Sequence, residues 1–501
     1  MGKSVIIIGA GLAGLSAGCY CQMNGYQTSI FEHHTLPGGV AAAWRRRDYL
    51  IDGGIHFLMG YRPGTAFHEV LRQLGVIPAT PFIELTTYGR FIDEDRGRSL
   101  LVTSDLNRLA EELKALSPAD AGVVEELVSG ARAMQGLDLS EAGIGKPPEL
   151  SGRLERLREA WKLRRLLRYF GGRYARPVSE FVREVKDPGL RSCLQHLFLP
   201  EVPVWFIFML LGLLADGELG LIEGGCRDFV SALERRFCDL GGRICYQSTV
   251  ERILVEGNRA VGVRLADGRE HRCEAVVSAA DGYSTIFQML EGRYLSDRIK
   301  NRYNSWRLIW PMLMVSYGVA REFAGEPAFT TIMLKRPLMV NRRPVKMVFL
   351  RIFNYSNRFA PPGHTVVQVE FETEWDFWND LQRHDRAAYN NEKQRIAAEV
   401  LERLESHFPG LGRQVEVTDV ATPYTTWRYT LNRQGAWEGW LPTPEVITTP
   451  VERTLPGLKD FYLAGQWVMP GGGVSPCIYS GRHVAQLLCH RDRKRFKVQF
   501  P

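Results

Sequence analysis

The feature that most constrains the fold is the run of residues 4–14, "SVIIIGAGLAG", near the start of the 501-residue chain. Its first five residues are mostly β-branched and apolar, as in a strand buried on both faces of a parallel sheet. Three glycines follow in the spacing G-x-G-x-x-G, and a helical stretch then ends at Gly25. A second strand over residues 27–31 ends beside an acid, Glu32. This order of elements predicts a βαβ unit that binds a dinucleotide.

Each of these glycines has a physical task in such a site. Gly9 allows the tight turn, Gly11 lets a pyrophosphate approach the backbone, and Gly14 lets the helix pack closely on the strand. The free N–H groups at the start of the helix attract phosphate. Glu32 lies where an acid can accept hydrogen bonds from the ribose hydroxyls. The alternative is a glycine-rich turn without a ligand.

A second pair of glycines, Gly38 and Gly39, follows Glu32 closely. A glycine pair directly after the ribose acid is more similar to FAD-dependent oxidoreductases than to NAD dehydrogenases. No second complete fingerprint with a trailing acid occurs in the sequence, so nothing indicates a separate NAD(P) domain.

Length and composition narrow the class of protein. The length exceeds one ordinary core, which predicts two domains or one domain with a large insertion. The net charge of +7 is too small to indicate nucleic acid, and we expect none. Nine cysteines without a C-x-x-C pair indicate neither a zinc site nor a disulfide framework, so we expect no metal and a reducing, cytoplasmic compartment. We expect no signal peptide before the glycine motif, and the longest apolar run, residues 204–214, is shorter than a membrane-spanning helix.

The C-terminal region contains a further glycine-rich stretch, "FYLAGQWVMPGGGVSPCIYSG", over residues 461–481. Three consecutive glycines indicate that the backbone approaches something closely. Ser475 and Pro476 suit the N-cap and first position of a helix. The positive end of that helix would point at whatever lies beside Gly471–Gly473, and it would favour the reduced form of a flavin placed there.

Three segments, residues 4–60, 223–281 and 461–488, resemble the phytoene desaturase, carotenoid isomerase and retinol saturase family of flavoproteins, within the wider amine-oxidase-like group. The first contains "YLIDGGIH" after the glycine pair, and the second begins "EGGCRDFVSALERRF" and ends "EAVVSAAD". The sequence departs from the family pattern at Val40, at Gln466 and at Ile222-Glu223, where the family often has an arginine, an acid and Tyr-Pro.

The resemblance implies an α/β fold with a Rossmann-type FAD-binding domain and a discontinuous α+β substrate domain. The FAD-binding domain would comprise residues 1–75, 220–290 and 455–490, and the substrate domain residues 76–219 and 291–454. The motifs and the resemblance together indicate these FAD-binding residues: Gly9, Gly11, Leu12, Ala13, Gly14, Glu32, Gly38, Gly39, Val250, Ala279, Gly465, Gln466, Gly472, Gly473 and Val474.

The candidate catalytic residue is His56, which the resemblance places along the face of the flavin and which suits acid–base chemistry. The alternative is a structural histidine. Glu370, Glu372 and Glu374 would share one face of a strand, most simply a solvated face, although a buried member of the group would serve as an acid.

The predicted function is that of an FAD-dependent oxidoreductase acting on a lipophilic polyene by hydride transfer to or from flavin N5, as in desaturation, with a quinone or oxygen as electron acceptor. Alternatives in the same family are a reduced-flavin double-bond isomerase and a saturase. A non-catalytic prenyl-lipid carrier of the same fold is a third. An amine oxidase is disfavoured by the apolar run and by a basic helix.

That basic helix is predicted over residues 153–176, which hold nine Lys or Arg and two Glu at amphipathic spacing. It indicates either a peripheral contact with an anionic membrane or a solvated helix packed on the core. The tryptophans at 375, 378, 427, 437 and 440 would line a slot for an apolar substrate or belong to the core.

Overall fold

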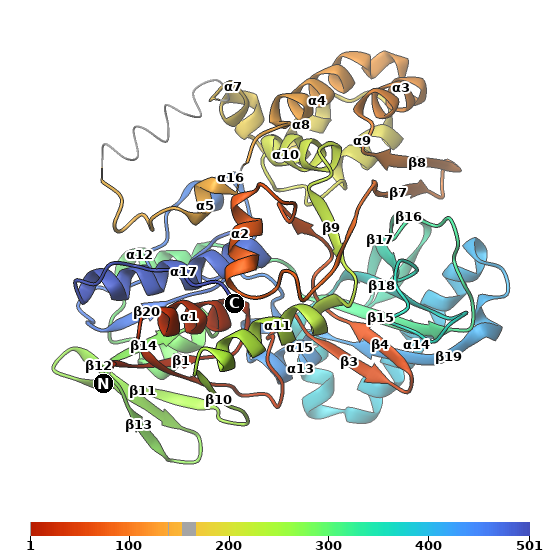
Figure 1. The fold of residues 1–501 in the computed structure, drawn as a ribbon. Helices are drawn as coiled ribbons and strands as arrows, with labels where there is room; N and C mark the ends of the chain where they lie inside the picture. The colour runs from red at the N-terminus through yellow and green to blue at the C-terminus, as the bar shows by residue number, and fades with distance from the viewer. Residues whose placement is uncertain (1, 139, 153–166) are drawn as a thin grey trace.

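A computed structural model describes residues 2–138, 140–152 and 167–501. One of its two large sheets has five strands, all parallel, in the order β10-β2-β1-β14-β20, and lies at the lower left in Figure 1. The strands are β10 (Arg243–Cys245), β2 (Gln27–Phe31), β1 (Ser4–Ile8), β14 (Ala275–Ser278) and β20 (Phe461–Leu463). The sheet therefore takes strands from the beginning, the middle and the end of the sequence.

Three helices pack beside this sheet: α1 (Leu12–Met23), α11 (Gly225–Asp239) and α17 (Val474–Arg491). Small residues bring them close, because a Cβ on Gly481 would lie 2.5 Å from the carbonyl oxygen of Ala13. Ser16 donates its hydroxyl hydrogen to the carbonyl of Ile478 at 2.7 Å. Helices from opposite ends of the sequence thus share one core.

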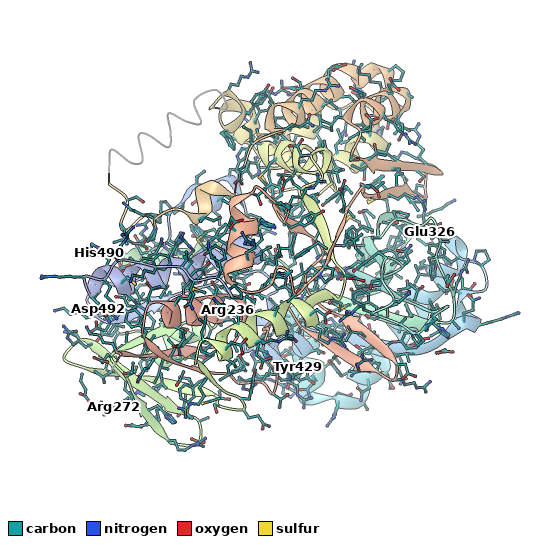
Figure 2. All side chains as sticks on the ribbon, viewed as in Figure 1. Arg236, Arg272, Glu326, Tyr429, His490 and Asp492 are labelled. Carbon is teal, nitrogen blue, oxygen red and sulfur yellow. The ribbon has the colours of Figure 1, made fainter. Side chains whose placement is uncertain are left out.

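The C-terminal tail is held against the same layer. Arg236 of α11 is labelled in Figure 2. It donates from Nη2 to the carbonyl of Gln499 at 2.6 Å, and from Nε at 3.2 Å to the carbonyl of Gln73 at the end of α2 (Ala66–Gln73). The ion pair Lys3–Asp492, 2.8 Å long, joins the two ends of the chain.

A small antiparallel sheet of β11 (Val250–Glu256), β12 (Arg259–Leu265) and β13 (Glu270–Arg272) follows β10. Its turns fall at Gly257-Asn258 and Asp267-Gly268, where turn residues interrupt the alternating pattern of the sequence. Asn258 has a φ of +59°, which asparagine tolerates in a tight turn.

The second large sheet has seven strands in the order β19-β15-β18-β17-β16-β7-β8. They are β19 (Val415–Ala421), β15 (Met312–Val319), β18 (Thr365–Glu372), β17 (Arg343–Ile352), β16 (Phe329–Val340), β7 (Thr87–Asp93) and β8 (Arg98–Thr103). Helix α14 (Arg386–His407) packs on it together with α13 (Trp375–His384). Figure 1 shows this sheet beside the parallel one. The domain boundaries given above stay a prediction.

Short pairings connect the two sheets: β3 (Ala43–Arg46) with β4 (Tyr49–Asp52), and β9 (Leu219–Ile222) between β5 (Leu58–Met59) and β6 (Phe82–Glu84). Above β7 and β8 stands a group of helices, α3 (Leu106–Leu116), α4 (Ala121–Met134), α9 (Pro188–Gln195) and α10 (Val204–Ala215) (Figure 1).

The apolar run 204–214 forms α10, most of whose residues belong to the core of this helical group. Among the residues that the structure describes, no helix has the length and apolar character needed to cross a membrane. Of the predicted basic helix 153–176, residues 153–166 lie outside the described residues. The remainder includes α7 (Leu167–Phe170) and a short 3-10 turn (Gly172–Ala175).

Candidate functional site

A cavity of about 1200 Å³ lies between the two large sheets, and its wall is built by residues from Ile8 to Tyr479. At one end it is lined by the glycine motifs of the parallel sheet, and at the other by apolar side chains of α10 and the seven-stranded sheet. Every predicted FAD-binding residue except Gly14 lines this cavity, and so does His56.

The first motif shows two different uses of glycine. A Cβ on Gly14 would overlap the carbonyl oxygen of Gly9, so Gly14 serves the packing of α1 on β1. Gly11 has an ordinary φ of −70°, and the nearest protein atom to a Cβ there, the carbonyl oxygen of Gly38, would be 4.0 Å away. The fold does not require glycine at position 11. The bare backbone therefore leaves space in the cavity, as a phosphate group needs.

Glu32 is buried at the edge of the same loop. Its carboxylate accepts hydrogen bonds from the backbone N–H of Ala10 at 2.6 Å and of His34 at 2.7 Å. Burial raises the pKa of Glu32, and these two N–H donors act in the opposite direction. The second glycine pair lies against the first motif, since Gly38 bridges to Gly11 and donates its N–H to the carbonyl of Ala10 at 2.9 Å.

Val250 and Ala279 contribute the middle wall of this end of the cavity. Val250 is the first residue of β11, and the N–H of Ala279 bonds the carbonyl of Ile8 at 2.9 Å directly after β14. Arg433, which no sequence motif indicates, also lines the cavity, and its guanidinium lies 4.3 Å from the ring centre of Tyr283.

The C-terminal glycines close the cavity from the side of α17. The N–H of Gly465 donates to Ser480 Oγ at 2.7 Å, which holds the segment against the helix. The helix begins at Val474 with Gly473 as N-cap, two residues before the predicted Ser475 cap, because the positive φ of +87° at Gly473 makes the turn into the helix. No side chain caps this end, and residues 473–477 line the cavity, so its N–H groups are available to a ligand.

His56 lies where the glycine-lined end and the apolar end of the cavity meet, a place we call the junction. Its Nε2 lies 2.8 Å from Glu370 Oε2, and Glu370 Oε1 accepts from Arg351 at 3.2 Å. Arg351 also donates to the carbonyl of Ile55 at 3.2 Å and to Gln368 at 3.1 Å. The ring of His56 lies edge-on to other aromatic rings, those of Phe349 at 5.4 Å and Trp437 at 5.5 Å between centres.

The charges behind His56 are almost completely buried. Burial alone would raise the pKa of Glu370, but the charge and hydrogen bond of His56, together with Arg351, hold it below its usual range. Burial raises the pKa of the nearby Asp52, although Arg351 and the N–H of Cys226, 2.6 Å away, act against this. Glu370 is thus the ionised partner of the group. The expectation of a solvated face was wrong for this residue, because Arg351 on the neighbouring strand compensates its charge.

The other end of the cavity is apolar. Its wall is formed by residues of α10, of the segment before it and of the seven-stranded sheet: Leu197, Phe198, Leu199, Trp205, Phe206, Met209, Leu213, Phe329, Met347 and Phe349. Of the late tryptophans, those at 375, 427 and 437 line the cavity, whereas Trp378 and Trp440 are core residues.

Two of the other carboxyl groups that line the cavity have a pKa raised to about 7. The pKa of Glu372 is raised to about 7 by burial and by the nearby Glu201. Glu438, in the loop before α16 (Pro444–Thr448), has its pKa raised to about 7 by burial. Glu374 lies outside the strand and pairs with Arg343 at 2.8 Å. No spacing in the sequence distinguishes Glu438 from an ordinary loop residue.

Comparisons with known proteins agree with this geometry. A family described as "FAD dependent oxidoreductase" matches residues 224–487, more than half of the chain, and an NAD(P)-binding Rossmann-like domain matches residues 7–74. The chain is 25% identical to the chloroplastic prolycopene isomerase of Arabidopsis thaliana, over 95% of this chain and 81% of the relative. It is 25% identical to the neurosporene-forming phytoene desaturase of Rhodobacter capsulatus, over 97% of this chain and 94% of the relative.

Solved structures show the same fold at lower identity. An oxidoreductase from Methanosarcina mazei superposes with a TM-score of 0.60 at 18% identity, over 96% of this chain and all of that one. Cyclohexylamine oxidase from Brevibacterium oxydans gives a TM-score of 0.59 at 15% identity, over 99% and 100%. With its glycine motifs gathered on one cavity, the chain belongs to the FAD-dependent oxidoreductase family, as an enzyme similar to phytoene desaturases and carotenoid isomerases that uses a flavin.

Proposed function

We propose that this enzyme binds FAD and acts on a long apolar polyene of the carotenoid or isoprenoid type. One observation carries the proposal. A single cavity extends from the glycine motifs to the apolar end lined by α10 and the seven-stranded sheet, which we call the apolar chamber. Because the two compartments are continuous, an apolar chain in the chamber would reach a flavin held by the glycines.

The residues present fit FAD. The uncrowded backbone at Gly11 and the start of α1 would hold the pyrophosphate, and Glu32 the ribose. Val250 and Ala279 would lie beside the adenosine part. Gly465, Gln466 and the uncapped start of α17 would hold the flavin part, with Gly472, Gly473 and Val474 leaving room for its ring. When bound, a flavin would accept or donate hydride, a two-electron transfer. A quinone or oxygen would reoxidise the reduced flavin.

The protein's own side chains would orient the polyene and exclude water. The edge-on rings around His56 offer flat apolar surfaces to a conjugated chain. His56 is the proposed acid–base residue at this junction. Glu370 and Arg351 fix the orientation of its ring, as a second layer of charged partners does in many active sites.

Desaturation is the proposed reaction, and double-bond isomerisation or saturation is the second candidate. Isomerisation stays a candidate because the chain is 25% identical in sequence, over 95% of its length, to a prolycopene isomerase. As a test, the purified flavin-containing protein is incubated with a cis-polyene, once with its flavin oxidised and once with its flavin reduced beforehand. Desaturation predicts products with added double bonds from oxidised enzyme only. Turnover by the reduced form alone, without net redox change, contradicts desaturation and supports isomerisation.

Filling the apolar chamber gives a second test of the same proposal. Met209 of α10 lines the chamber, so Met209→Trp should reduce turnover of a long polyene while the flavin content stays the same. Met209→Ala is the matched control and should retain turnover. Equal turnover by Met209→Trp and wild type would contradict the placement of the substrate.

We also propose that the substrate enters from a membrane surface that the protein contacts peripherally. Support comes from aromatic side chains near α7, where the ring centres of Phe170 and Trp205 lie 5.3 Å apart and Trp205 lines the cavity. Sedimentation with anionic vesicles should retain the protein at low salt and release it at high salt. Absence of binding at low salt would contradict this.

A further inference from the structure

Glu438 occupies a special position on the cavity wall. It belongs to the loop between a 3-10 turn (Arg433–Gly435) and α16, and it directly follows Trp437, whose ring contacts His56. On its other side it lies against the last glycine segment. A Cβ on Gly472 would be 2.6 Å from the carbonyl oxygen of Glu438 and 2.9 Å from its Cβ. The residue therefore stands where the glycine end and the apolar end of the cavity meet.

The carboxyl group of Glu438 has no protein partner within the described residues, either by hydrogen bond or by ion pair. This separates it from Glu32 and Glu370 on the same cavity wall. Glu32 accepts from two backbone N–H groups, and Glu370 is bound by His56 and Arg351. A half-buried carboxyl group that lines a cavity and lacks a partner is a group that a ligand can satisfy.

His56 is bound in a way that gives it the opposite chemical character. Because Glu370 is ionised and can only accept, the hydrogen on His56 lies on Nε2. Nδ1 then carries a lone pair when the ring is neutral, and it has no hydrogen-bond partner within the described residues. The junction therefore holds a nitrogen base and a carboxyl group, Glu438, that are not bonded to each other.

We propose that Glu438 is a catalytic residue that contacts the polyene and transfers a proton to or from it, in a pair with His56. The inference rests on the proposed function and adds the residue that moves the proton. In desaturation, hydride would leave one carbon with both electrons of its C–H bond, and a flavin held by the glycine segments would accept it. The neighbouring C–H bond then breaks, its electron pair forms the new double bond, and the proton goes to the Glu438 carboxylate.

In the isomerisation or saturation direction the same group acts as an acid. The O–H bond of Glu438 breaks, and an electron pair of the polyene forms a C–H bond with the released proton, which leaves a cation on the neighbouring carbon. In saturation this cation would take a hydride from a reduced flavin. In isomerisation it would rotate about the C–C bond and return the proton to the Glu438 carboxylate, whose departure restores the double bond. Burial places the pKa of Glu438 at about 7. Cys477, the titratable group of α17 near it, has its pKa raised to about 12 by burial and by Glu438, so the thiol stays neutral in this range.

The sign of the pH dependence then reports the direction of the reaction. A carboxylate acting as base is present above about pH 7, so the rate should rise as the pH passes through that value. A carboxylic acid is present below it, so the rate should fall as the pH rises. Glu438→Gln should remove this limb in either case.

The test compares Glu438→Gln and Glu438→Asp with a control, Glu445→Gln, at an exposed residue of α16. Flavin content and thermal unfolding are measured first. With flavin retained, Glu438→Gln should lose about 100-fold in turnover, the scale of general acid–base catalysis. Glu438→Asp should retain part of the rate with its pH limb. The control should match wild type. Turnover of Glu438→Gln within about twofold of wild type, with the pH limb unchanged, would overturn the proposal.

A second readout does not depend on turnover. The infrared difference spectrum of wild type minus Glu438→Gln should show a protonated carboxyl band that disappears as the pH is raised through about 7. If Glu438→Gln does not fold, Glu438→Ala, which also lacks the carboxyl group, takes its place in the difference spectrum. A protein with this band but without flavin or polyene turnover would contradict the proposed function and leave the acid identified. A flavin enzyme without the band would contradict the role of Glu438 alone.

Discussion

Replacing Arg351 by methionine tests the electrostatics behind His56 most directly. Only 2% of Arg351 and 1% of Glu370 are exposed, and their charged atoms lie 3.2 Å apart. Arg351→Met leaves the Glu370 carboxylate buried with His56 as its remaining hydrogen-bond partner. Removing one member of a buried ion pair typically costs about 3–5 kcal/mol, and we expect a loss of this size in the free energy of unfolding at pH 7.

The pH dependence gives the sign of the effect. The pKa of Glu370 is held low in the folded wild type, so its contribution to stability is present above the unfolded pKa and is lost as the pH falls through the folded one. Without Arg351 that pKa rises, and each unit of rise costs about 1.4 kcal/mol at neutral pH. The destabilisation by Arg351→Met should therefore shrink between pH 7 and pH 5, where Glu370 can bind a proton.

The assay is urea unfolding of wild type, of both single variants and of the double variant Arg351→Met/Glu370→Gln at pH 8, 7 and 5. The double variant removes the unpaired charge. We therefore expect it to be more stable than Arg351→Met at pH 7, with a coupling of about 1–3 kcal/mol. A destabilisation that stays constant from pH 8 to pH 5, with a double variant no more stable than Arg351→Met, would refute the reasoning.

Three further substitutions test local packing and hydrogen bonding: Gly14→Ala, its control Gly122→Ala, and Ser480→Ala. Gly14→Ala should lower the free energy of unfolding by about 1–3 kcal/mol and reduce flavin retention, because the added Cβ would overlap the carbonyl of Gly9. Gly122→Ala in α4 should raise the free energy of unfolding by about 0.8 kcal/mol, because a Cβ there would meet no neighbouring atom within 4 Å. Equal unfolding free energies would contradict this. Ser480→Ala should cost about 1–3 kcal/mol because the N–H of Gly465 loses its partner, and an unchanged melting curve would contradict that role.

The dinucleotide end was predictable from sequence because its signals are local. The spacing of the glycines and the apolar run before them fix β1 and the start of α1 within a few residues. The prediction of the α17 cap was displaced by two residues, since Ser475 and Pro476 fit the usual pattern while Gly473 makes the turn. Backbone conformation decided between two plausible starts.

The junction could not be predicted in the same way. His56 and Glu370 are 314 residues apart, and Arg351 comes from a different strand than Glu370. The alternation of Glu370, Glu372 and Glu374 predicts a common face, but only the neighbouring strand shows which carboxylate is compensated and buried. No sequence pattern marks Glu438, because its properties come from its surroundings on the cavity wall, where no described residue pairs with its carboxyl group.

The place of β20 at one edge of the parallel sheet affects how the protein is made. The strand pairs with β14 through Phe461–Leu463, and α17 follows it. From the synthesis of β14 until β20 and α17 have been made, β14 has an unpaired edge and α1 lacks the helix that later covers it. Such edges promote aggregation of nascent chains. The yield of this enzyme should therefore depend on chaperone protection late in translation.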